Sequence, residues 1–153
     1  MEPDTQTGPS ANDMRAFAYL LLGRREYSLR ELENRLRKKW PQAEGIEVLV
    51  AQLEGENLVS DERFAESFLR SRIRRNQGPV KIRAELKGRG VPNAVIRNTL
   101  EAASPGWLEL AMEWLQRQHP EKLSFEEKPK YYRRLLNRGF THSQAMDAIN
   151  QVR

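Results

Sequence analysis

Hydrophobic side chains recur every three or four residues along most of this chain, which is the spacing of helices that bury one face. In the first third, the pattern predicts helices from residue 12 or 13 to the connection at 24–27, from 29 to about 40, and over 44–56. Farther along, it predicts helices over residues 61–76, 79–89, 92–102, 107–119, 128–138 and 141–152. No segment shows convincing strand alternation, so the expected fold class is all-α.

Several of the predicted helices begin with a cap that can be read from the sequence. Ser28 and Glu31 have the spacing of a capping box, in which each side chain accepts a hydrogen bond from the other residue's amide. Residues 141–144 repeat that spacing. Ser60 is expected to cap the helix predicted over residues 61–76, and Asp61 would then lie in the first turn of that helix, at the positive end of its dipole. These positions predict where the helices start.

The predicted helices fall into repeated groups of three. Residues 86–92 align with residues 135–141 at an offset of 49, and a left-handed cap is expected at the helix end that Gly88 and Gly90 flank. A period near 50 with three helices per unit is typical of a tandem array. We therefore expect three tandem three-helix repeats, resembling helix-turn-helix or homeodomain units, in an elongated curved array that stays monomeric. The expected divisions are a disordered leader over residues 1–11 and repeats over residues 12–57, 58–104 and 105–153.

Positive charge is concentrated in the central repeat. The chain has a net charge of +5, yet residues 63–97 alone hold ten Lys and Arg side chains against Glu66 and Glu85. Within the helices, only Glu66 before Arg70 and Glu85 before Arg89 are spaced to relieve the repulsion between these cations. Such crowding favours a polyanionic partner, with a solvated face as the alternative. The candidate binding residues are Arg70, Arg72, Arg74, Arg75, Lys81, Arg83, Lys87 and Arg89.

Residues that catalytic and metal sites commonly need are scarce. The chain has no cysteine, and its two histidines, His119 and His142, are interpreted as solvent-facing polar residues. Glu126 and Glu127 are adjacent rather than spaced on one helical face, and no phosphate-binding glycine motif occurs. We expect no enzymatic activity, no cofactor and no metal. The lack of cysteine and of an apolar run of ~20 residues predicts a cytoplasmic protein without a membrane partner.

The central repeat also carries a family resemblance. The segments that carry it are LVSDERFA at residues 58–65, RSR at 70–72 and ELKGRGV at 85–91. They resemble the central signature of the RecX family, bacterial proteins that bind and modulate the RecA recombinase. Ser60 and Asp61 stand where that family has an Asp-Asp pair, and the basic turn at residues 74–78 is shorter than in the family. The signature residues expected to be structural are Ser60, Asp61, Phe64, Leu86 and Gly90.

The resemblance implies a negative regulator that binds RecA and lies in the groove of the RecA filament on single-stranded DNA. It implies limited filament growth and lower ATPase, strand-exchange and coprotease activity of RecA in DNA repair and the SOS response. Double-stranded DNA is a further candidate partner. The alternative is an independent DNA-binding protein, a transcriptional regulator of the helix-turn-helix type. A nuclease is a third hypothesis, but it would need clustered acids for its metal ions, and the sequence offers no such cluster.

Overall fold

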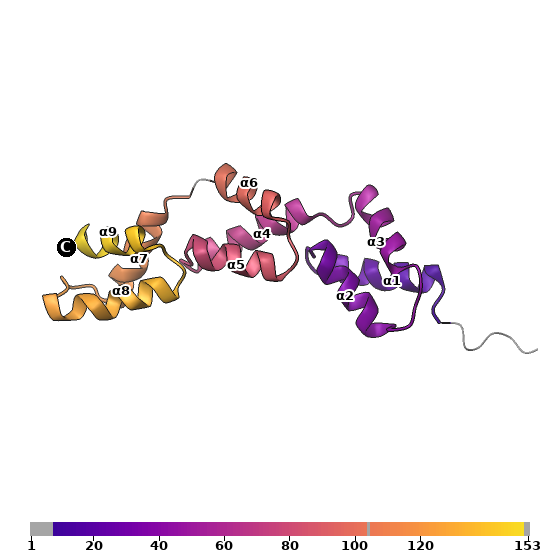
Figure 1. The fold of residues 1–153 in the computed structure, drawn as a ribbon, viewed down its shortest axis with the longest axis horizontal. Helices are drawn as coiled ribbons and strands as arrows, with labels where there is room; N and C mark the ends of the chain where they lie inside the picture. The colour runs from indigo at the N-terminus through magenta and orange to yellow at the C-terminus, as the bar shows by residue number, and fades with distance from the viewer. Residues whose placement is uncertain (1–7, 104, 152–153) are drawn as a thin grey trace, which may run out of the picture.

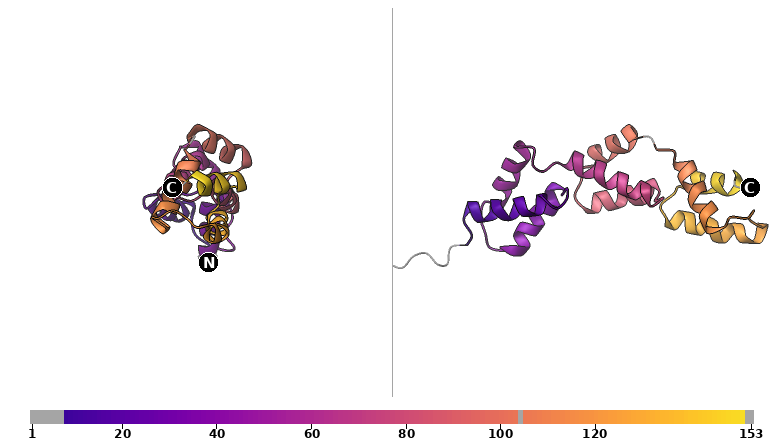
Figure 2. Two further views of the ribbon diagram at one scale, coloured as in Figure 1. Left: turned by 90° about the vertical axis from the view of Figure 1, so that its left-hand side faces the viewer. Right: turned by 180° about the vertical axis from the view of Figure 1, so that it is seen from behind.

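The computed structural model, which describes residues 8–103 and 105–151, is an elongated array of three helical units (Figure 1). The first unit contains α1 (Ala11–Leu22), α2 (Leu29–Lys39) and α3 (Ile46–Gly55). The second contains α4 (Asp61–Arg74), α5 (Pro79–Gly88) and α6 (Asn93–Ala103). The third contains α7 (Trp107–Gln118), the 3-10 turn η1 (Phe125–Glu127), α8 (Lys128–Asn137) and α9 (His142–Gln151). No strand occurs in the described ranges, and the end-on view shows how narrow the array is (Figure 2). The expected all-α fold of three-helix repeats is confirmed.

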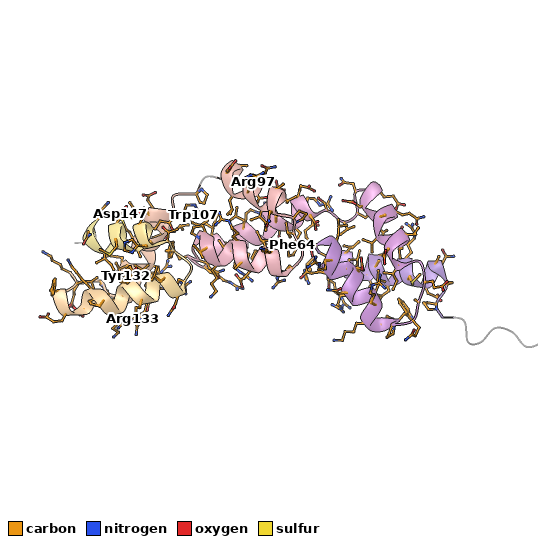
Figure 3. All side chains as sticks on the ribbon, in the orientation of Figure 1. Phe64, Arg97, Trp107, Tyr132, Arg133 and Asp147 are labelled. Atoms are coloured by element: carbon orange, nitrogen blue, oxygen red, sulfur yellow. The ribbon has the colours of Figure 1, made fainter. Side chains whose placement is uncertain are left out.

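Each unit buries a hydrophobic core of its own. The fully buried residues at the centres of the three cores include, in chain order, Leu32 and Leu36, Ile82 and Leu86, and Leu115 and Leu135. Phe64 is buried in the second core, with its ring centroid 5.7 Å from that of Phe68. Trp107 at the start of α7 packs against this second core as well, and it lies where the last two units meet (Figure 3). Because the cores are separate, the contacts between units decide how the units are oriented.

The predicted helix caps are present. Ser28 and Glu31 form their capping box, with both amide-to-side-chain distances at 3.1 Å. Thr141 and Gln144 form the equivalent box, at 2.9 and 3.1 Å. Ser60 caps α4 by accepting a hydrogen bond from the amide of the third helical residue, 3.2 Å away. Local capping therefore determines these three helix starts.

Some helix boundaries differ from the predicted ones, and the backbone explains why. α4 ends at Arg74 rather than at residue 76, because Asn76 has a left-handed backbone with φ of 52°. α3 begins at Ile46 rather than at residue 44, because Gly45 is also left-handed, with φ of 85°. The turn η1 precedes α8 and has its own capping box, which starts at Ser124.

The repeat seen in the sequence is reproduced in the backbone. Gly90 and Gly139, 49 residues apart, are both left-handed, with φ of 86° and 97°. Leu86 and Leu135, at the same offset, are both fully buried. The first unit departs from this pattern, because Trp40 follows α2 with φ of −132° and no left-handed glycine comes next. The second and third units are therefore the more similar pair.

The N-terminal region is described only in part. α1 begins at Ala11, with Ser10 as its cap, and the residues of the predicted leader from 1 to 7 lie outside the described range. No helix in the described part of the chain is long and apolar enough to cross a membrane.

Candidate functional site

The eight candidate binding residues, all of them basic side chains of the central unit, divide into two groups. Six are exposed and make no ion pair within the part of the chain that the structure describes, namely Arg70, Arg74, Arg75, Lys81, Arg83 and Lys87. Arg70 and Arg74 lie one helical turn apart on α4, and Arg83 and Lys87 lie one turn apart on α5. Glu66, which is spaced to relieve Arg70, makes no ion pair with it in the described residues. Each helix thus presents a pair of cations whose countercharge has to come from outside.

Arg72 and Arg89 form the second group, and both have partners inside the protein. The Arg72 guanidinium carbon is 4.1 Å from the centroid of the Phe68 ring, and Arg72 Nε is 3.4 Å from Glu85 Oε1. The Arg89 guanidinium carbon is 5.0 Å from the same centroid, and its NH1 donates to Glu31 Oε2 at 2.9 Å. The expected pairing of Glu85 with Arg89 is wrong. Glu85 pairs with α4, whereas Arg89 reaches α2 of the first unit.

Asp61 joins the first unit to the second. Its carboxylate is buried, and Oδ1 accepts a hydrogen bond at 2.9 Å from the amide of Leu29, the first residue of α2. Burial raises the pKa of Asp61 above its ordinary value, and the hydrogen bond from Leu29 opposes that rise. Across the same junction, Ser28 Oγ donates to the backbone carbonyl of Arg89 at 2.7 Å. The predicted position of Asp61 in the first turn of α4 is confirmed. Its side chain also accepts a hydrogen bond from the first residue of α2, so it lies at the starts of two helices.

Asn76 is the centre of the junction between the second and third units. It is 2% exposed, and its Nδ2 donates to the backbone carbonyl of Leu110 in α7 at 2.9 Å. Its Oδ1 accepts a hydrogen bond from the guanidinium of Arg117, and its backbone carbonyl accepts one from Arg138 Nε at 3.2 Å. Asparagine suits this position because it tolerates a left-handed backbone while its amide both donates and accepts.

The two junctions have similar geometry. In each, the end of the second helix of one unit contacts the start of the second helix of the preceding unit. A Cβ added to Gly90 would lie 2.5 Å from Arg30 Cβ, and one added to Gly139 would lie 2.4 Å from Lys81 Cβ. Glycine is needed at both places because it allows the left-handed backbone and the close approach together. The repeat therefore extends to the way in which consecutive units dock.

The structure corrects the interpretation of one histidine. His119 is largely buried at the side chain, its Nε2 is 2.8 Å from Glu127 Oε2, and its Nδ1 is 2.7 Å from the backbone carbonyl of Glu121. The carbonyl of Glu121 and then the carboxylate of Glu127 raise the pKa of His119. His142 is exposed, as expected. Among the described residues, no group of three or more His, Asp or Glu side chains is placed to hold a metal ion.

Comparison with known proteins shows which family this chain resembles in sequence. Residues 60–100 match the family model described as RecX, second three-helix domain. A regulatory protein RecX from Chromohalobacter salexigens is 43% identical over 133 residues, covering 86% of this chain and 88% of the relative. The chain belongs to the RecX family. Another regulatory protein RecX, from Halorhodospira halophila, is 34% identical and aligns over 94% of this chain and 91% of its own length.

Solved RecX structures share the fold. The crystal structure of RecX from Lactobacillus salivarius superposes with a TM-score of 0.78 at 20% identity, covering 94% of this chain and 98% of that one. A second crystal structure, of a regulatory protein RecX, gives a TM-score of 0.72 at 24% identity over 91% of this chain and 72% of the other. The three-unit arrangement is thus common to these RecX chains at low sequence identity.

The RecX signature residues of the central unit have structural roles here, and three further residues were missed. Ser60 caps α4, Asp61 bridges two units, Phe64 and Leu86 fill the second core, and Gly90 fits the first junction. Helical periodicity did not identify Asn76, Arg117 and Arg138 as residues of a junction. One signal was available, because Arg138-Gly139 aligns with Arg89-Gly90 at the repeat offset of 49.

Proposed function

We propose that this RecX protein is a negative regulator of RecA that binds RecA and the groove of the RecA filament on single-stranded DNA. Bound there, it limits filament growth and lowers the ATPase, strand-exchange and coprotease activities of RecA in DNA repair and the SOS response. One observation carries the proposal: six candidate cations that are exposed and form no ion pair with any described residue lie on the middle unit of an elongated array.

Electrostatics supports a polyanionic partner for the central unit. Like charges one turn apart, as at Arg70 and Arg74 or at Arg83 and Lys87, destabilise a free helix by a few tenths of a kcal/mol per pair. A nucleic-acid backbone or an acidic protein surface removes this repulsion and releases counterions. The six cations are the candidate contacts with DNA or RecA, while Arg72 and Arg89 contribute where their internal partners leave donors free.

The shape of the molecule supports a filament as the target. Three separate cores in a row make a rod rather than a globule (Figures 1 and 2). A rod that carries its charge in the middle can lie along a groove, with its end units against neighbouring protein subunits. We expect the protein to act in the cytoplasm as a monomer.

A helix-turn-helix transcriptional regulator is the second candidate, because each unit has three helices joined by short connections. Such a regulator would protect one defined site and prefer it over random DNA by roughly 10³-fold or more. The starts of α2 and α5 are engaged in the junctions between units, which favours the filament regulator.

Co-sedimentation tests the proposal directly. The protein is centrifuged at one concentration with RecA filaments on single-stranded DNA and, separately, with the naked DNA. The filament regulator predicts strong retention on filaments and weaker, strongly salt-dependent retention on naked DNA. Equal retention in both samples, or retention on one duplex sequence only, would contradict it.

A further inference from the structure

A pocket lined by arginines lies at the junction between the first and second units. It has a volume of ≈ 250 Å³, and its lining comes from the connection after α1 and from α4 together with the cap of α5. Its basic and hydroxyl-bearing residues are Arg25, Arg72, Arg89, Ser67 and Ser71, and Phe64, Phe68 and Glu26 complete it. The residues from two units meet here because Asp61 and Ser28 hold the units together.

Arg72 is fixed in place but keeps donors free. Its side chain is only 14% exposed, it stacks on Phe68, and its only ion pair in the described residues is the one from Nε to Glu85. NH1 and NH2 of Arg72 therefore have no acceptor in the part of the chain that the structure describes. An ordered guanidinium with free terminal N–H groups loses little side-chain entropy on binding an anion, which makes it a good oxyanion ligand.

The other donors around the pocket are similarly underused. Arg25 and Arg89 both use NH1 to contact Glu31, at 3.2 and 2.9 Å, so one carboxylate serves two guanidinium groups. Neither makes another ion pair among the described residues, which leaves their NH2 groups available. The hydroxyls of Ser67 and Ser71 also have no hydrogen-bond partner within the described ranges.

The acids near the pocket do not cancel its positive charge. Glu26 lines the pocket, but its carboxylate is bound by Arg63 Nε at 3.1 Å. Glu85 is shared between Arg72 and the side-chain amide of Gln77. Counting Arg63 with Arg25, Arg72 and Arg89, four guanidinium groups face three carboxylates, those of Glu26, Glu31 and Glu85, so one positive charge is left over.

We propose that this pocket binds one phosphodiester group of a nucleic-acid backbone. Guanidinium and hydroxyl donors that converge from several directions suit a tetrahedral phosphate, whereas a planar carboxylate is satisfied by a single two-pronged arginine. The inference rests on the proposed function, since it takes DNA as the partner. Because the lining comes from two units, a bound phosphate also ties the first unit to the second, next to the Asp61–Leu29 hydrogen bond.

The test measures binding to a fluorescent oligo(dT) strand by anisotropy over a range of salt concentrations. Arg72→Met removes the charge while its side chain still packs on Phe68, and we expect about tenfold weaker binding. The slope of log K against log salt should fall by about 0.7, the value for one phosphate contact on a single strand. Arg72→Lys keeps the charge and should keep the slope. Arg97→Ala is the matched control, because Arg97 is exposed on α6, outside the pocket (Figure 3).

Two further measurements separate the alternatives. Ser67→Ala with Ser71→Ala keeps all charges and should weaken oligo(dT) binding about threefold, which checks the pocket if Arg72→Met does not fold. In a titration followed by the NMR signal of Arg72 Nε–H, oligo(dT) should shift this signal. A shift with inorganic phosphate but not with oligo(dT) would overturn the proposal.

The outcome also distinguishes this inference from the proposed function. If the parent protein binds DNA and filaments but both pocket variants match it, the phosphate site is refuted and the regulatory role stands. If Arg72→Met weakens binding to RecA without DNA and leaves oligo(dT) binding intact, the pocket takes a protein carboxylate instead. If the parent protein binds neither DNA nor filaments, the proposed function itself fails.

Discussion

Asp61 Oδ1 accepts a hydrogen bond from the Leu29 amide at 2.9 Å, and this contact places one buried carboxylate at the starts of two helices, α4 and α2. The free amides at each helix start attract a negative charge, so both helices stabilise the carboxylate. The contact connects residues 32 positions apart in separate units. It is therefore one of the bonds that set the direction in which the second unit leaves the first.

Replacing Asp61 should cost stability according to whether the acceptor survives. Asp61→Ala leaves the Leu29 amide without its acceptor in a buried junction, which should lower the free energy of unfolding by about 1–3 kcal/mol. Asp61→Asn keeps an acceptor oxygen and should cost less than half as much. Urea unfolding of both variants at neutral pH measures the difference. Equal losses would mean that the bond to Leu29 is not what Asp61 contributes.

The pH dependence of stability should also report on Asp61. Folding raises the pKa of Asp61, chiefly through burial, so the folded state favours its protonated form. The contribution of the raised pKa to stability is complete below the ordinary value of 3.8 and is lost as the pH rises through the folded-state pKa. Relative to Asp61→Asn, the parent protein should therefore gain stability as the solution is acidified. A difference that is independent of pH would contradict the raised pKa.

A single methyl group should disturb the second junction. A Cβ on Gly78 would lie 2.3 Å from backbone atoms of Gly139 and Phe140, and it would displace the Gly78 amide from the Arg138 carbonyl, 2.7 Å away. Gly78→Ala should therefore cost about 1–3 kcal/mol and loosen the third unit from the second. Urea unfolding and small-angle X-ray scattering measure the two effects.

The control for this change is a glycine with open space around it. Gly88 is the last residue of α5, and an added Cβ would have no neighbour within 4 Å. Gly88→Ala should stabilise the helix by about 0.5–1 kcal/mol and leave the scattering profile unchanged. A scattering profile of Gly78→Ala that matches this control would show that the close contact does not orient the units.

The pair of His119 and Glu127 should titrate as a unit. The carbonyl of Glu121 and the carboxylate of Glu127 raise the pKa of His119, so its contribution is present below 6.5 and is lost as the pH rises through the raised value. Hydrogen bonds from Ser124, and then His119, lower the pKa of Glu127, so its contribution is present above 4.5 and is lost on acidification. The connection before α8 should therefore be best ordered between pH 4.5 and pH 6.5, where both contributions are present.

An NMR titration of the imidazole signals checks this pairing. The pKa of His119 should lie above 6.5 in the parent protein, and Glu127→Gln should lower it by removing the carboxylate. The imidazole signal of His142, which is exposed at the start of α9, is the internal reference. An unchanged His119 titration in Glu127→Gln would refute the pairing.

Much of the local structure could be predicted because it depends on neighbours in the sequence. The capping boxes at Ser28 and Thr141 follow from short-range geometry, and the structure confirms them. A left-handed cap at the end of α5 was also predicted, and the structure places it at Gly90 rather than at Gly88. The hydrophobic stripes likewise predicted the all-α array. The predicted end of α4 was two residues too late, because Asn76 is left-handed and its conformation depends on contacts with the next unit.

The junctions could not be predicted, because their partners lie far apart in the chain. Arg89 pairs with Glu31, 58 residues away, rather than with Glu85, which lies four residues before it in the sequence. His119 was interpreted as solvent-facing because nothing in the sequence shows that the connection after α7 folds back to bring Glu127 beside it. Helical periodicity shows which face is apolar, but it does not show which charged side chains meet across two units.

Charge reversal on the central unit tests the account most directly. The variant combines Arg70→Glu, Arg74→Glu, Arg83→Glu and Lys87→Glu, and the measurement is inhibition of the single-stranded-DNA-dependent ATPase of RecA. The control combines Arg24→Glu, Lys38→Glu, Lys122→Glu and Arg133→Glu, which changes the net charge equally at exposed positions of the end units. We predict that the central variant loses inhibition while the control retains most of it. Undiminished inhibition by the central variant would contradict the account.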